Sequence, residues 1–234
     1  MVLASCLVAL VPGVAAAESR VSGDFNGDGT DDLAIGVPGE GFGGNDFAGV
    51  VQVIYGSTGP GLAAPGNQLW HQDSPGIKEV AEDGDQFGSS LAAGDFDGDG
   101  TDDLAIGAHF ETFGGNNRAG VVQVLYGTAG GLDAAGNQLW SQDSPQIKEV
   151  AEGGDFFGEA LAAGDFDGDG VDDLAIGAPG ESFGGKDSAG VVQVLYGTSG
   201  GLAAAGNQLW HQDSPGIKEV AESADRFGEV LPGG

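Results

Sequence analysis

The chain is built from one sequence unit that occurs three times. The tetrapeptide NQLW recurs at steps of 70 residues, ending at Trp70, Trp140 and Trp210. The dipeptide Phe-Gly recurs at the same step, at Phe87-Gly88, Phe157-Gly158 and Phe227-Gly228. A repeated unit of this kind is one supersecondary element that buries its apolar face against its neighbours. The repeat therefore constrains the fold more than any other feature of the sequence.

Each unit carries short apolar segments separated by Gly, Asn and Asp. In the middle copy these segments are residues 90–93, 103–106, 120–126 and 138–141. None is long enough, with a period of 3.6 residues, to predict a helix. Four antiparallel strands repeated radially are typical of a propeller, so the sequence predicts an all-β fold, a β-propeller of four-stranded antiparallel blades. A β-solenoid is the alternative, but a 70-residue unit is too long for one solenoid rung.

The repeat also predicts where the blades begin and end. Residues 18–86, 87–156 and 157–226 form three complete units, and residues 227–234 begin a fourth, with 227–231 as its first strand. Propellers typically have 4 to 8 blades. We therefore expect about three blades in an open or truncated ring. Such a ring is a fragment of a longer protein or closes by self-association through its open blade edges.

One loop in each unit places oxygen-bearing side chains at alternating positions. The loop reads DFNGDGTDD over residues 24–32 and recurs over 95–103 and 165–173. Oxygen ligands at positions 1, 3, 5 and 9, a carbonyl at position 7 and Gly at position 6 for a sharp turn suit Ca²⁺, which takes 6 to 8 oxygen ligands. We expect about three Ca²⁺ per chain. The predicted ligands are Asp24, Asn26, Asp28, Thr30 and Asp32; Asp95, Asp97, Asp99, Thr101 and Asp103; and Asp165, Asp167, Asp169, Val171 and Asp173.

The crowding of acids in these loops favours a metal site over a simple turn. Two carboxylates about 5 Å apart repel each other by roughly 3 kcal/mol at an effective dielectric near 20. Position 12 is Ile, where an EF-hand has Glu, and a strand follows in place of a helix. The residues at position 8, Asp31, Asp102 and Asp172, are expected to point into solvent.

These motifs resemble a known family. Phe-Gly, then LAAGDFDGDGTDDLAIG, then Gly-Ala-Pro are similar to the FG-GAP repeat of integrin alpha-subunit propellers and of bacterial integrin-like secreted proteins. The resemblance implies one blade per repeat, a ring of usually seven blades, and Ca²⁺ in the loop between the first two strands. Gly-Ala-Pro is intact only at 177–179, and no inserted adhesion domain is present.

The net charge and the N-terminal residues indicate the kinds of partner and the location of the protein. Lys and Arg number 7 against 36 Asp and Glu, a net charge of −29, which disfavours nucleic acid and anionic membrane surfaces as partners. Residues 1–17 are apolar and end in Ala-Ala-Ala, which predicts a signal peptide or a hydrophobic N-terminus. Cys6 also lies in a lipobox-like sequence, which leaves lipidation open. No segment is long enough to predict a membrane span, so we expect a secreted or cell-surface protein.

Strings that look catalytic fail when the repeats are compared. Residues 180–187 nearly match a phosphate-binding P-loop, but Lys186 corresponds to Asn45 and Asn116. No arrangement of the three His residues forms a triad. Glu79, with Glu149 and Glu219, follows a Lys in each copy, which predicts a solvated charge pair. Trp70, Trp140 and Trp210 either pack between blades or form aromatic platforms for a sugar, whereas Phe25, Phe96 and Phe166 are expected in the core.

The sequence therefore predicts a secreted calcium-binding propeller that acts in adhesion or protein interaction and is not an enzyme. Its partner would be an extracellular protein or glycan. Two alternatives stay open: the propeller appendage of a secreted hydrolase or lyase, and a multivalent glycan-binding propeller.

Overall fold

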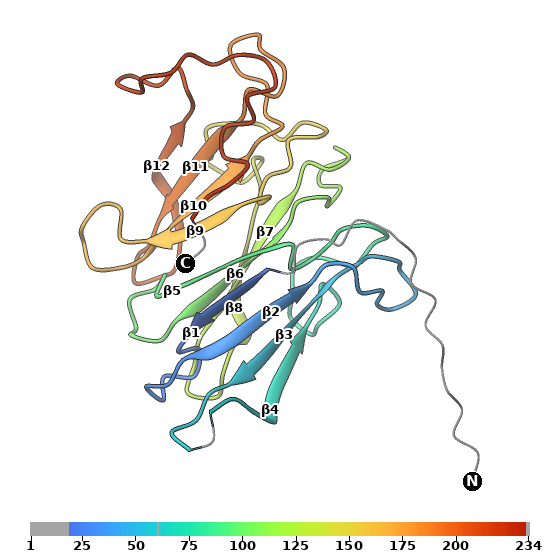
Figure 1. Ribbon diagram of the computed structural model, residues 1–234, viewed down its shortest axis with the longest axis vertical. Helices are drawn as coiled ribbons and strands as arrows, with labels where there is room; N and C mark the ends of the chain where they lie inside the picture. Colours follow the sequence, from blue (N-terminus) through green and yellow to red (C-terminus); the bar gives the residue numbers. More distant parts are fainter. Residues whose placement is uncertain (1–18, 60, 233–234) are drawn as a thin grey trace.

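The chain folds into three four-stranded antiparallel sheets, each a simple meander (Figure 1). The computed structural model describes residues 19–59 and 61–232, and this part of the chain contains strands and no helix. The strands are β1 (Arg20–Gly23), β2 (Asp32–Val37), β3 (Val50–Tyr55) and β4 (Ala63–Trp70); β5 (Ser90–Gly94), β6 (Asp103–Ala108), β7 (Val121–Tyr126) and β8 (Asp133–Trp140); and β9 (Leu161–Gly164), β10 (Asp173–Ala178), β11 (Val191–Tyr196) and β12 (Ala203–Trp210). The predicted all-β fold of four-stranded blades is confirmed.

The fourth strand of each sheet is longer than its apolar residues indicate. We predicted 138–141 in the middle copy, whereas β8 spans Asp133–Trp140. Its first half is rich in Ala and Gly, which the pattern assigned to a turn. Pairing with β7 extends the strand, since Asp133 lies opposite Tyr126 beyond an irregularity in the register.

The hydrophobic core lies between the sheets. One cluster joins Val21, Val51 and Val53 of the first sheet to Leu104 and Ile106 of the second. A second cluster joins the second sheet to the third in the same way. The inner strands β1, β5 and β9 contact one another in sequence. Each sheet is thus stabilised by burial of apolar area against its neighbour, as the blades of a propeller are.

Each Phe-Gly dipeptide contacts the blade that precedes it in the sequence. Phe87 is 1% exposed, and its amide donates to the carbonyl of Ala48 in the preceding blade at 2.9 Å. A Cβ on Gly36 would lie 1.9 Å from the carbonyl oxygen of Gly88, so only glycine fits there. The amide of Gly88 donates to Gly107 in its own blade at 3.0 Å. The dipeptide therefore contacts two blades. The predicted blade boundaries, 18–86, 87–156 and 157–226, stay predictions.

The three blades do not close into a ring. The equivalent strands β6 and β10 are buried along their whole length, whereas β2 alternates between buried and half-exposed residues. Leu33 and Ile35 are half-exposed, although their counterparts Leu104 and Ile106 are fully buried. The first blade therefore presents an apolar face that no blade covers within the described residues.

The start of a fourth blade at 227–234 stays a prediction, although the described part of this segment forms no strand. Phe227 and Gly228 dock on the third blade as the earlier copies dock, with the Phe227 amide donating to Ala189 at 2.9 Å. Residues 227–232 nevertheless contain turns and bends rather than a strand. A strand needs a hydrogen-bonded neighbour, and in the described chain none lies beside this segment. The predicted signal peptide at 1–17 and Cys6 lie outside the described residues, as do Gly233 and Gly234.

Candidate metal centres

In each of the three sheets, one acidic loop connects the first strand to the second. The three loops therefore lie at equivalent places in their blades. Their tight shape depends on glycine at positions 4 and 6. In the second loop Gly98 and Gly100 have φ of 71° and 90°, a region that other residues rarely adopt. The other two loops have positive φ at the same positions. The sequence-predicted turn is therefore formed in all three copies.

The carboxylate at position 1 organises each loop. The two oxygens of Asp95 accept hydrogen bonds from the amides of Asp99 at 3.0 Å and Gly100 at 2.9 Å. Asp97 also accepts from the Asp99 amide, and Asp99 accepts from the Thr101 amide at 2.8 Å. The same bonds form around Asp24 and Asp165. Amide donors orient these side chains toward the loop interior and leave carboxylate lone pairs free.

The aspartate at position 9 is buried and anchored by backbone amides. Asp103 is 1% exposed and accepts from Gly127 at 2.9 Å and from Phe96 at 2.8 Å. Burial raises the pKa of Asp103 to about 8, with neighbouring Asp97 adding to the rise. Burial raises the pKa of Asp32 and of Asp173 as well. The Oδ2 atom of Asp32 is buried without a hydrogen-bond partner.

The structure brings several predicted ligands together. Carboxylate oxygens of Asp95, Asp97 and Asp99 lie within 4.8 Å of one another, as do those of Asp165, Asp167 and Asp173. Among the described residues, the three salt bridges of Lys and Arg all lie elsewhere. In the second and third loops, these converging carboxylates fit a hard divalent cation. For Thr30, Thr101 and Val171, the carbonyl role at position 7 stays a prediction.

The expectation that position 8 points into solvent is wrong for two of three copies. The carboxylate of Asp102 accepts from the amide of Asp24 in the preceding blade at 2.7 Å, and the Asp102 amide donates to the Asp24 carbonyl at 3.1 Å. Asp172 contacts Asp95 in the same way. Only Asp31 is exposed, because no described blade precedes it. These contacts link the three loops into one row.

The aromatic residues of the repeat mostly pack between blades. Trp70 and Trp140 are half-buried against the two interblade clusters, whereas Trp210 is 36% exposed. Phe25 and Phe96 are fully buried, as expected. Phe166, expected in the core, is 53% exposed, because no described blade follows the third. The structure therefore favours packing over sugar platforms for the first two Trp residues.

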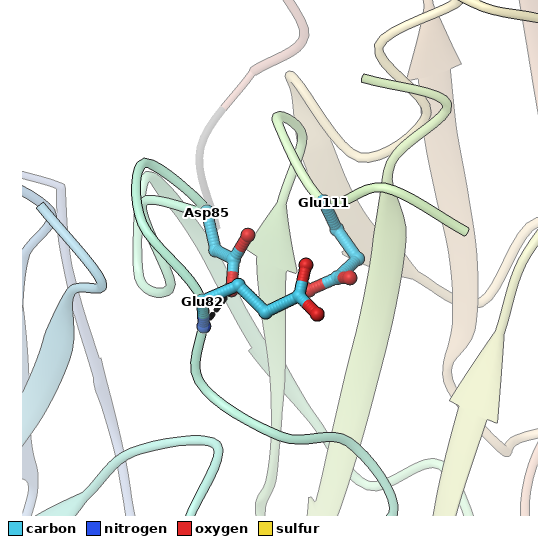
Figure 2. A group of neighbouring side chains, drawn as sticks. All are labelled: Glu82, Asp85 and Glu111. Atoms are coloured by element: carbon cyan, nitrogen blue, oxygen red, sulfur yellow. Dashed lines mark hydrogen bonds between the residues drawn. The ribbon is translucent and has the colours of Figure 1, made fainter. Parts of the chain in front are cut away.

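A second kind of acidic cluster escaped the sequence analysis. Glu82 and Asp85, between β4 and β5, meet Glu111 from the loop between β6 and β7 (Figure 2). Glu152, Asp155 and Glu181 form the same group at the next junction. Burial, followed by the charge of Asp85, raises the pKa of Glu111 to about 8. Glu111 lies 26 residues after Asp85, so only the recurrence of these acids at steps of about 70 could have indicated the group.

The structure shows what surrounds Lys186 and Glu79, two residues considered from the sequence as candidates for a function. Lys186, in the P-loop-like string, forms a salt bridge with Asp213 at 2.7 Å. The expected solvated charge pair at Glu79 is wrong, because its Oε2 atom is buried without a hydrogen-bond partner and no described salt bridge joins it to Lys78. Burial raises the pKa of Glu79, and Asp85 adds to the rise. In the described part of the chain, no helix is long and apolar enough to span a bilayer.

Comparison with known proteins identifies the family to which the repeats belong. The FG-GAP repeat family matches residues 19–54, 87–125 and 157–195. Integrin alpha-PS2 of Drosophila melanogaster is 33% identical over 219 residues, covering 92% of this chain and 14% of that protein. Phosphatidylinositol-glycan-specific phospholipase D of Rattus norvegicus is 34% identical over 116 residues, covering 50% of this chain and 14% of that protein.

Among solved structures, the similarity is weaker. A rhamnogalacturonan lyase of Bacillus licheniformis is 12% identical with a TM-score of 0.47, covering 85% of this chain and 35% of that chain. A similarity this low supports no inference about function. The chain spans only 14% of the length of integrin alpha-PS2 and of the rat phospholipase D.

Proposed function

Because this chain is an FG-GAP repeat protein similar to integrin alpha subunits, we propose that it is a secreted or cell-surface calcium-binding propeller module that acts in adhesion or protein interaction. Its acidic loops would hold about three Ca²⁺, and it would have no catalytic role of its own. The ligand would be an extracellular protein or glycan.

One observation carries this proposal: the same acidic loop occurs in three adjacent blades, and backbone contacts join each loop to the next. A cation neutralises carboxylates that would otherwise repel each other. With the loops held, the blades that they connect keep their relative positions. The likeness to integrin alpha subunits supports a role in adhesion, and the net charge of −29 argues against nucleic acid as a partner.

The calcium sites are tested by titration calorimetry of the chelated chain. Asp28→Ala removes an exposed predicted ligand, and Asp31→Ala removes an exposed acid three residues away in the same loop. We expect Asp28→Ala to lower the number of bound Ca²⁺ by one and Asp31→Ala to leave it unchanged. Equal binding by the wild type and by Asp28→Ala would contradict the assignment of this loop.

The uncovered apolar face of the first blade is a candidate surface for self-association. Leu33 and Ile35 on the first blade are the counterparts of residues that the second blade buries against a neighbour. We propose that a blade of a second copy covers this face when no other blade does. Sedimentation of the chain at increasing concentration would show a rising average mass, and a constant monomer mass would refute self-association.

A second candidate rests on the likeness to the rat phospholipase D. In that case the propeller is an appendage of a secreted hydrolase or lyase. The sequence that flanks these residues in the gene decides between the two, because a catalytic domain beside the propeller would favour the second candidate.

A further inference from the structure

The two acidic groups between blades, here called the junction clusters, share one architecture. The first consists of Glu82, Asp85 and Glu111, and Figure 2 shows the three side chains converging from two segments of the chain. Their carboxylate oxygens lie within 4.8 Å of one another. Each cluster takes two acids from the segment that leaves one blade and the third acid from the next blade.

Two of the three acids in each junction cluster are buried without a compensating positive charge, and the third, Glu82 or Glu152, is exposed. Asp85 and Glu111 are each 3% exposed, as is Glu181 in the second cluster. Salt bridges of the described residues involve only Lys186 and Arg226, and neither pairs with these acids. Glu79 adds further negative charge beside the first cluster. Buried carboxylates in this arrangement require a counter-charge or a proton.

A buried amide beside each cluster supplies an independent indication of a ligand. Gln72 is 2% exposed, and its Nε2 donates to Glu111 at 2.6 Å, which places the amide against the cluster. The Oε1 atom of the same amide is buried and has no hydrogen-bond partner. Gln142 repeats every feature beside Glu181. A buried amide oxygen without a donor costs free energy, and amide oxygens are ligands that Ca²⁺ accepts.

We propose that each junction cluster binds a divalent cation of the calcium type, held by three carboxylates and the amide oxygen of Gln72 or Gln142. These sites are separate from the loops between the first and second strands. A cation here would connect consecutive blades directly, because its ligands come from both. A site needs a complete junction. Glu40 matches Glu111 in the first blade but is exposed, and Glu222 matches Glu82 but has no described following blade.

The test counts Ca²⁺ bound per chain by equilibrium dialysis. Glu82 and Glu152 are exposed enough to be replaced without disturbing the core, so the test variant is Glu82→Gln with Glu152→Gln. The matched control is Glu40→Gln with Glu222→Gln, which makes the same charge change outside a complete cluster. A third variant, Asp28→Ala with Asp99→Ala and Asp169→Ala, disables the loops.

We expect five Ca²⁺ in the wild type and in the control, three in the junction variant, and two in the loop variant. A wild type that binds three, with no loss in the junction variant, would overturn this proposal and show that the buried acids hold protons instead. A wild type that binds two, with no loss in the loop variant, would overturn the loop sites and leave the junction sites standing.

Discussion

At the scale of single residues, equivalent positions of the repeat have different roles because their neighbours in the folded chain differ. Asp31 and Asp102 both stand at position 8 of their loops, yet Asp31 is exposed and Asp102 accepts a hydrogen bond from the preceding blade. Within a loop, the spacing of oxygens and glycines predicted the convergence of two groups, Asp95, Asp97 and Asp99, and Asp165, Asp167 and Asp173. The other ligands stay predictions. The role of Asp102 was not predictable, since its partner Asp24 lies 78 residues away.

Asp102→Ala therefore should destabilise the chain, whereas Asp31→Ala should not. Loss of a carboxylate that accepts from a partly buried amide costs about 1–3 kcal/mol in the free energy of unfolding. An exposed substitution stays within about 0.5 kcal/mol. Urea unfolding of both variants in excess calcium at physiological salt measures the difference. Equal stabilities would contradict a link between loops through Asp102.

At the scale of elements, the sequence predicts each blade and leaves the packing between blades open. The strands were located by alternating apolar segments, but the start of β8 was missed because Ala and Gly carry no strand signal. The junction clusters were missed because Gln72 and Glu111 meet only when one blade lies on the next. Phe166 was placed in the core by its repeat position, although it depends on a following blade for cover.

The two Phe residues give a matched comparison at this scale. Phe96 is fully buried between the second and third blades, and Phe166 is 53% exposed on the third. Phe96→Ala should lower the free energy of unfolding by about 3–5 kcal/mol, because it leaves a cavity in the core. Phe166→Ala should cost less than about 1 kcal/mol. Denaturant titration with saturating calcium measures both, and similar costs would show that the core is not interblade.

At the scale of the whole molecule, stability depends on a row of contacts between neighbouring blades. Each blade buries its faces against the next, and the acidic loops and the Phe-Gly dipeptides follow the same order. In such arrays stability is close to a sum of terms from each unit and each interface. On the proposed function, a cation that holds one loop would therefore support the adjoining interface as well.

Thermal melting with and without calcium tests the central claim most directly. One bound ion contributes about 2.7 kcal/mol when calcium is about 100 times its dissociation constant, and 1 kcal/mol shifts the melting temperature of a chain this size by about 2–4 °C. We predict that calcium raises the melting temperature of the wild type by more than about 10 °C. Most of that rise should disappear in the combined Asp28→Ala, Asp99→Ala and Asp169→Ala variant. A wild type that melts at the same temperature in chelator and in calcium, or a triple variant that keeps the full rise, would contradict the account.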